Sequence, residues 1–231
     1  MKNHLKSITS PKTWKILRKS NVFIARPTPG THSLSMGMPL VVILRDILHL
    51  ALTSTEVKKI LNNQEILIDG KRQKDHRFMV GLFDVLSIPK MKKHYRIVLD
   101  QKGRLIVKEI NEKESSIKPC KIVGKSVLPK GKIQFNLYDG KNIISDKKAS
   151  VGDSFVLSLP SLDIKEVLPL EEKKQVFLIS GKHSGDLGVL KEIKGSLAVY
   201  VTDGEEVETA RKYLFVVGDG KNTVVDLKNK E

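Results

Sequence analysis

The first 34 residues combine closely spaced basic side chains with no acidic residue, and the first carboxylate of the chain is Asp46. The basic set comprises Lys2, His4, Lys6, Lys12, Lys15, Arg18, Lys19, Arg26 and His32. Lysine and arginine bind phosphates, while histidine and the single tryptophan, Trp14, can stack on an exposed base. We therefore predict an RNA-binding arm over residues 1–34 that becomes ordered on its ligand. The alternative is a disordered tail that only increases solubility.

The net charge of the chain is concentrated in its N-terminal half. Residues 1–110 contain 21 Lys and Arg against 8 Asp and Glu, whereas residues 111–231 contain 20 against 18. Solubility alone requires no such asymmetry. A polyanion bound to the first half would favour it, because each neutralised phosphate releases counterions.

Residues 35–89 are predicted to form a small α/β unit that positions further cations. Pro39 fits the first position of a helix, because its missing N–H would have no partner there. The apolar face of this helix would comprise Leu40, Ile43, Leu44, Ile47, Leu48 and Ala51. Thr53 and Glu56 have the spacing of a capping box, which predicts a second helix through Leu61.

An Asp69-Gly70 pair follows the apolar segment 65–68 and predicts a tight hairpin turn. A further strand is expected over residues 84–88, before Pro89. Cations gather around the turn and on the first helix, and we expect them to contact phosphates: Arg45, Lys71, Arg72, Lys74 and Arg77.

This order of two helices, a strand, an Asp-Gly turn and basic residues resembles the S-four RNA-binding domain. That domain occurs in ribosomal proteins, some tRNA synthetases and some RNA-modifying enzymes. Its Gly-Asp pair before the last strand is present in stretched form, as Gly81-Leu82-Phe83-Asp84-Val85.

Longer segments resemble one ribosomal protein family, the small-subunit family S-four-e of archaea and eukaryotes. The matching segments include His4-Leu5-Lys6, Ala25-Arg26-Pro27-Thr28-Pro29-Gly30-Thr31-His32, Leu44-Arg45-Asp46, Ile68-Asp69-Gly70-Lys71 and Ile88-Pro89-Lys90. Tyr95-Arg96 and Leu99-Asp100-Gln101-Lys102-Gly103-Arg104 also match. The resemblance extends over residues 2–220 and implies binding to small-subunit ribosomal RNA and to neighbouring ribosomal proteins.

From residue 95 the chain changes to short apolar segments separated by turns about every ten residues, which is typical of a small β-barrel or sandwich. Residues 96–99 and 104–107 would form a hairpin. The segment from Gly131 to Asn142, with an Asp139-Gly140 turn, resembles the central domain of the same family.

A second β region is expected after a charged boundary at residues 169–174. Gly181, Gly185 and Gly188 follow a predicted strand at residues 175–180, and their spacing allows a tight loop with accessible backbone amides. The pattern resembles the KOW motif of SH3-like barrels, which places Lys182 and His183 at an RNA contact. The alternative is an ordinary β-turn.

We find no catalytic or metal-binding pattern in the sequence, and expect no cofactor and no small-molecule substrate. There is no phosphate-binding P-loop, no His-Glu-x-x-His helix and no Gly-x-Ser-x-Gly elbow. The six histidines lack ligand spacing. The single cysteine, Cys120, excludes an intrachain disulfide and is predicted to be a buried small side chain. This cysteine usage indicates a reducing, cytoplasmic compartment. Without a run of ~20 apolar residues, we expect no membrane association.

We therefore predict a multidomain α+β chain, in which a small α/β S-four module precedes two small, mostly β domains. The expected divisions are an arm at 1–34, the S-four domain at 35–94, a central β domain at 95–170, a KOW SH3-like barrel at 171–220 and a polar tail at 221–231. The predicted function is a non-enzymatic constituent of the small ribosomal subunit that binds and organises its RNA. The alternatives are a salt-labile translation or transcription factor and an RNA-modifying enzyme with an S-four clamp.

Overall fold

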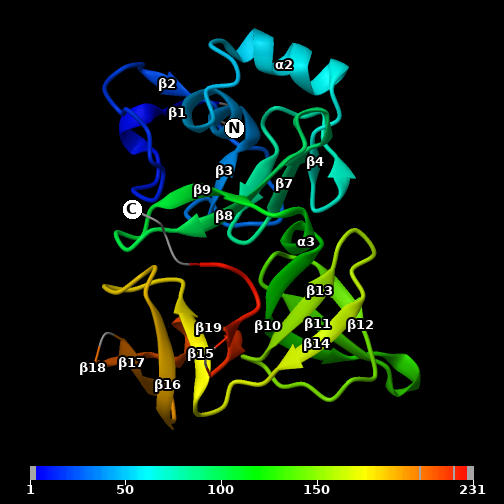
Figure 1. Cartoon of the computed structure of the whole chain (residues 1–231), viewed down its shortest axis with the longest axis vertical. Helices are drawn as coiled ribbons and strands as arrows, with labels where there is room; N and C mark the ends of the chain where they lie inside the picture. The colour runs from blue at the N-terminus through cyan, green and yellow to red at the C-terminus, as the bar shows by residue number, and fades with distance from the viewer. Residues whose placement is uncertain (1–3, 203, 221, 228–231) are drawn as a thin grey trace. The chain divides into compact units, whose positions relative to one another are not determined.

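The computed structural model describes residues 4–202, 204–220 and 222–227, and over these ranges the chain is mostly β with short helices (Figure 1). The strands are distributed over several sheets, which confirms the prediction of a strand-rich chain at this level. Two compact units are formed. The first contains Met1–Val98 and Arg104–Ser115, and the second contains Leu99–Gly103 and Ser116–Glu231.

The first unit contains three small antiparallel sheets. One pairs β1 (Leu5–Lys6) with β2 (Phe23–Ile24), and another pairs β3 (Gly37–Pro39) with β6 (Met79–Gly81). The largest has the order β5-β4-β7-β8-β9 and comprises β4 (Leu67–Ile68), β5 (Lys71–Arg72), β7 (Val85–Ile88), β8 (Lys93–Leu99) and β9 (Leu105–Ile110). Short 3₁₀ turns occupy Ser7–Thr9 and Pro89–Met91, and α3 (Glu112–Ser115) follows β9.

The first helix is shorter than the sequence pattern predicts. It begins as α1 (Leu40–Val42) and continues as a π-helical turn over Ile43–Ile47. Pro39 lies just before it as the N-cap residue, not at the first helical position. The left-handed conformation of His49, with φ of 52°, follows the helix. The predicted helix through residue 51 is therefore wrong, because the wider π turn interrupts the 3.6-residue spacing.

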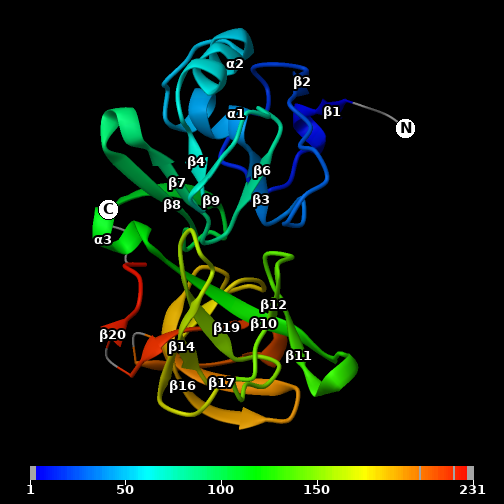
Figure 2. The same ribbon diagram turned by 90° about the vertical axis from the view of Figure 1, so that its right-hand side faces the viewer.

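The second helix, α2 (Ser54–Asn63), begins at the predicted capping box. The Glu56 N–H donates to the Thr53 hydroxyl at 3.2 Å, and the Glu56 carboxylate accepts from the Leu52 N–H at 2.8 Å. These bonds satisfy two backbone donors that the helix itself cannot pair. The Leu52 bond also lowers the pKa of Glu56. In both ribbon views α2 lies at the end of the unit away from β8 and β9 (Figure 2).

Replacing Thr53 with Ala should remove this cap and lower the free energy of unfolding by about 1 kcal/mol. Urea denaturation followed by circular dichroism would measure the change. Thr55, which is exposed on the same helix, provides the matched control as Thr55→Ala. Equal stability of the two variants would contradict a capping role for Thr53.

The Asp69-Gly70 pair forms the predicted hairpin turn between β4 and β5. Both residues have positive φ, at 50° and 76°, and Ile68 lies opposite Lys71 in the antiparallel register. Two positive φ values are required by the turn type that best matches strand twist. The Asp69 carboxylate also accepts from the Val85 N–H at 3.1 Å, so the turn residue joins β4 to β7.

The second unit contains two larger antiparallel sheets. The first has the order β12-β11-β10-β13-β14 and comprises β10 (Ile117–Val127), β11 (Ile133–Leu137), β12 (Asn142–Ile144), β13 (Ser154–Ser158) and β14 (Ile164–Leu168). The second has the order β18-β17-β16-β15-β19-β20 and comprises β15 (Lys174–Leu178), β16 (Leu187–Lys194), β17 (Leu197–Thr202), β18 (Glu205–Ala210), β19 (Leu214–Asp219) and β20 (Asn222–Thr223). Short 3₁₀ turns cover Pro129–Gly131 and Arg211–Tyr213.

One hydrophobic cluster joins the two sheets of the second unit, while another lies within the first of these sheets. Val156 and Leu168 of the first sheet pack in the same cluster as Val176 and Val216 of the second. The buried ammonium of Lys121, on β10, donates to the carbonyls of residues 212 and 214 at 2.7 and 2.6 Å. Burial lowers the pKa of Lys121 to about 8. The regions predicted as separate central and KOW domains therefore pack as one unit.

The predicted division between residues 94 and 95 falls within β8. This strand pairs with β7 through Val85 opposite Arg96, so it continues the sheet of the first unit. Arg96 is fully buried and bonds to the carboxylate of Glu114, in α3, at 2.7 Å. The sequence pattern showed the hairpin itself but not which sheet it would join, because strand pairing is a tertiary property.

Candidate nucleic-acid interface

Most of the basic residues that the sequence singled out in the first unit are exposed. The exposed set is His4, Lys6, Lys12, Lys15, Lys19, Arg26, Lys71, Arg72, Lys74 and Arg77. Residues 4–26 of this set lie on β1, β2 or the segments around them, while Lys71 and Arg72 form β5, at the edge of the larger sheet. Exposed cations on a folded surface can neutralise phosphates without unfolding the protein. Lys2 lies outside the described residues.

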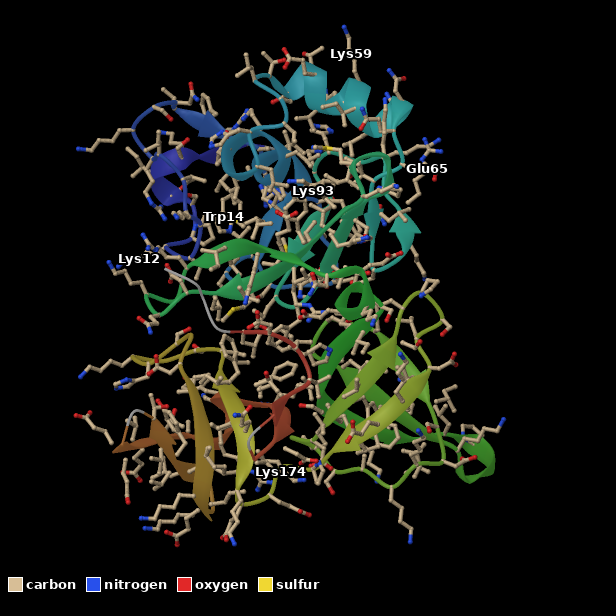
Figure 3. The ribbon with its side chains drawn as sticks, in the orientation of Figure 1. Lys12, Trp14, Lys59, Glu65, Lys93 and Lys174 are labelled. Carbon is tan, nitrogen blue, oxygen red and sulfur yellow. The ribbon has the colours of Figure 1, made fainter. Side chains whose placement is uncertain are left out.

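Trp14 does not belong to this exposed set. Its side chain is only 2% exposed, and its indole N–H donates to the Gly37 carbonyl at 2.8 Å. The neighbouring Thr13 carbonyl accepts from the Leu105 N–H at 2.7 Å. Figure 3 shows Trp14 inside the unit, whereas Lys12 and Lys59 point outward. The prediction of a base-stacking tryptophan is wrong for this conformation, because the ring is part of the core.

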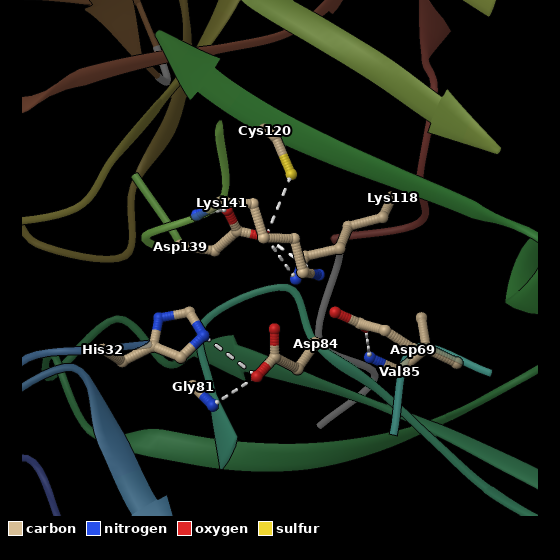
Figure 4. Close-up of polar contacts among 9 residues, drawn as sticks. All are labelled: His32, Asp69, Gly81, Asp84, Val85, Lys118, Cys120, Asp139 and Lys141. Atoms are coloured by element: carbon tan, nitrogen blue, oxygen red, sulfur yellow. Dashed lines mark hydrogen bonds and ion pairs between the residues drawn. The ribbon is translucent and has the colours of Figure 1, made fainter. Parts of the chain in front are cut away.

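His32 is also buried and fixes the end of the arm. Its Nε2 lies 2.9 Å from the carboxylate of Asp84, which also accepts from the Gly81 N–H at 2.8 Å (Figure 4). The ring lies directly over Gly81, since a Cβ built there would come within 2.2 Å of it. The stretched Gly-Asp segment thus forms a seat for His32. A direct RNA contact by His32 is ruled out in this structure by its burial.

Residues 4–34 are therefore folded onto the first unit. The argument for a disordered arm assumed that repulsion between cations and a lack of apolar area would keep it unfolded. The structure separates the two kinds of residue: cations lie outside, while Trp14, Pro27 and His32 are buried. The lone tryptophan among lysines was the sequence feature that could have indicated this packing.

Arg18 and Arg45 of the predicted site have internal partners. The Arg18 guanidinium donates to the Ser10 carbonyl at 2.6 Å and also to the Pro11 carbonyl, so it stabilises the loop. Neutral carbonyls leave its positive charge uncompensated. Arg45 instead forms a paired contact with the Asp46 carboxylate, at 2.7 and 2.8 Å, and this hydrogen bonding raises the pKa of Arg45. The neighbouring carboxylate offsets the charge that Arg45 would present to a phosphate.

Arg72 is exposed but partly held by α2. Its guanidinium donates to the Asn62 carbonyl at 3.1 Å, in the last turn of the helix. A cation at this end is favoured, because unpaired carbonyls give the helix C-terminus a partial negative charge. This contact orients Arg72 beside Lys71 on β5.

The glycine-rich loop of the second unit turns tightly, as predicted. Gly181 and Gly185 have φ values of 101° and 97°, in a region that other residues rarely adopt. Gly185 also lies against the Asp100 carbonyl of the same unit, where a Cβ would come within 1.9 Å of the oxygen. Lys182 is exposed, whereas half-buried His183 is 3.3 Å from the Asp186 carboxylate. Lys182 is the better placed of the two predicted contacts.

A buried ionic cluster in the second unit was not predicted from the sequence. The Lys118 ammonium is 1% exposed and lies 2.9 Å from the Asp139 carboxylate, which is also 3.1 Å from Lys141 (Figure 4). Cys120 is buried, as predicted, with its sulfur 3.6 Å from the same carboxylate. Asp139 keeps its predicted turn role by accepting from the Lys141 N–H at 3.2 Å. Asp139 thus connects its turn to Lys118 and Cys120 of β10.

In the part of the chain that the structure describes, no group of three or more His, Cys, Asp or Glu side chains is arranged to hold a metal ion. Over the same residues, no helix has both the length and the apolar character needed to span a membrane.

Comparisons with known proteins place the chain in a family. The family model described as Ribosomal family S4e matches residues 91–164, and the one described as RS4NT (NUC023) domain matches residues 1–35. A small ribosomal subunit protein eS4 of Methanocella arvoryzae is 40% identical, with 98% of each chain covered. That of Methanosphaera stadtmanae is 41% identical, with 96% of this chain and 95% of the relative covered.

A solved structure agrees with these sequence matches. The crystal structure of the 30S ribosomal protein S4e from Thermoplasma acidophilum superposes with a TM-score of 0.72 at 28% identity. The match covers 82% of this chain and 99% of the other. The chain belongs to the S4e family of ribosomal proteins, which confirms the S-four-e resemblance.

Proposed function

We propose that this protein is a structural, non-enzymatic constituent of the small ribosomal subunit that binds and organises small-subunit ribosomal RNA in the cytoplasm. The observation that carries the RNA contact is the set of ten exposed basic residues that the first unit presents on a folded scaffold. The relatives named small ribosomal subunit protein support the ribosomal assignment, because the match covers nearly the full length of both chains.

The exposed cations would bind phosphates and set the position of the protein on RNA. In paired RNA the deep major groove is not read by side chains, so shape and backbone contacts dominate. Lys71 and Lys74 follow the Asp69-Gly70 turn and would contact one phosphate strand, while Lys6, Lys12 and Lys19 of the arm would contact another. Arg72 and Arg77 would add to the phosphate contacts of Lys71 and Lys74.

We assign an arm at 1–34, an S-four domain that begins at residue 35 and includes the β8–β9 hairpin, a central β region that continues to residue 170, and a KOW region at 171–220 to which β20 adds an edge strand. The meander β15 to β18, with β19 beside β15, supports an SH3-like barrel for the KOW region. Its glycine loop and Lys182 would add an RNA contact. The low net charge of the second half suits contacts with neighbouring ribosomal proteins.

Sedimentation tests this function directly. Tagged protein in native cell lysate should pass through a high-salt sucrose cushion with small ribosomal subunits, at one copy per subunit. A tagged protein of similar charge but unrelated fold serves as the control for electrostatic adhesion. Release of the protein into the unbound fraction at high salt would contradict a structural role and favour a transient translation factor.

A further inference from the structure

A groove in the first unit lies between the arm and the helical turn that precedes α2. Its volume is about 480 Å³, within the roughly 300–1,000 Å³ typical of ligand pockets. Lys15, Leu17 and Phe23 line it from the arm, and Asp46 and Leu52 line it from the other side. The phosphate contacts proposed above do not account for the apolar part of this groove.

The groove has unusually exposed apolar walls. Leu17 is 83% exposed, Leu52 is 86% exposed and Phe23 is 55% exposed. Clustered exposed apolar side chains indicate a contact surface, whereas single ones need no explanation. The Phe23 ring is held in place by an edge-to-face contact with His4, at 5.4 Å between ring centroids. β2 therefore presents a positioned aromatic ring beside the groove.

The charges around the groove favour an anionic ligand over a basic one. The chain has no acidic residue before Asp46, and the Asp46 carboxylate is already paired with Arg45. Lys15 is exposed at the groove, and Lys6 lies opposite Phe23 in the β1–β2 register. A basic peptide, or the basic arm of a second copy, would be repelled. An anion that carries a flat apolar group could pack against the apolar walls and pair with the lysines.

We propose that this groove binds the base of one unpaired RNA nucleotide, with Phe23 as the stacking surface and Lys15 as the contact to its phosphate. Unpaired bases stack on aromatic rings with little sequence preference. Ser20 and Asn21 also line the groove and supply polar groups for the base edge. This inference rests on the RNA-binding function proposed above and adds single-strand recognition to it.

Fluorescence anisotropy with full-length protein tests the proposal. The probes are a labelled ten-nucleotide oligouridylate and a blunt ten-base-pair RNA duplex. Phe23→Ala should weaken oligouridylate binding by about 5- to 150-fold, the range expected for loss of one stacking contact, and leave duplex binding unchanged. Phe23→Trp should preserve binding. Ile8→Ala is the matched control, because Ile8 is an exposed apolar residue of the arm that does not line the groove.

The outcomes separate the two proposals. Equal oligouridylate binding by Phe23→Ala and Ile8→Ala would overturn the groove assignment while duplex binding still supports the proposed function. A wild-type protein that binds neither probe would overturn both. Concentration-dependent dimerisation that is lost in Phe23→Ala, measured by analytical ultracentrifugation, would identify a second copy of the chain as the occupant and overturn the nucleotide assignment.

Discussion

Replacing Lys6, Lys12 and Lys19 together with glutamine is expected to weaken binding to ribosomal RNA by about a hundredfold at 0.15 M salt. All three are exposed on the folded arm. Each phosphate contact contributes about 0.9 to the slope of log K against log salt, so the slope should become shallower by roughly 3. Filter binding across a salt series would measure both quantities. Arg18 is retained in this variant, because it holds the loop through backbone carbonyls.

A charge-matched control is available in the second unit. Lys132, Lys148 and Lys165 are also exposed, and their triple glutamine variant removes the same net charge from the protein. If the arm binds phosphates directly, this control should leave the salt slope nearly unchanged. An equal loss of slope in both variants would show that net charge, not the arm, determines RNA affinity.

The substitution Gly81→Ala should lower the free energy of unfolding by about 2–6 kcal/mol. Its Cβ would come within 2.2 Å of the His32 ring, so the ring must leave its seat. The strain of overpacking, about 1–3 kcal/mol, adds to the loss of the buried contact between His32 and Asp84, about 1–3 kcal/mol. Urea denaturation would measure the loss, and limited proteolysis would detect release of the arm.

Gly30→Ala is the control for this substitution. Gly30 lies in the same arm, and a Cβ there would meet its nearest neighbours at an ordinary 3.7 Å. In a second comparison, Gly81→Ala should destabilise a His32→Ala background much less than the wild type, because the clash partner is absent. If Gly81→Ala is as stable as Gly30→Ala, the seat does not hold the arm.

The local features of this fold were predictable from sequence. The Asp69-Gly70 turn and the capping box of Thr53 and Glu56 formed at the expected residues, because each depends on neighbours within a few positions. The length of α1 was less predictable, since a π turn leaves no clear pattern in residue types. Among the described residues, the lysines that the sequence singled out for RNA binding are exposed, and their contact with RNA stays a prediction.

Contacts between residues far apart in the sequence could be identified only from the structure. Trp14 reaches Gly37, and His32 reaches Asp84 across 52 positions of sequence, so neither partner could be inferred from spacing. Lysine is almost never fully buried unless it is paired, so the residue type gave no reason to expect Lys118 to be buried beside Asp139. The pairing of β8 with β7 likewise depends on how the strands pack. It continues the sheet of the first unit across the boundary expected between residues 94 and 95.

Because the arm is already folded, the free energy of binding RNA would not include the cost of ordering it. Ordering a flexible segment costs about 1–2 kcal/mol per residue in backbone entropy, and a disordered arm would subtract that cost from its affinity for RNA. Here Trp14 and His32 anchor the arm within the protein's own core, so folding of the monomer has already offset the cost. If the arm binds RNA as proposed, it would do so as a preorganised surface, and the rearrangement on binding would fall mainly on the RNA.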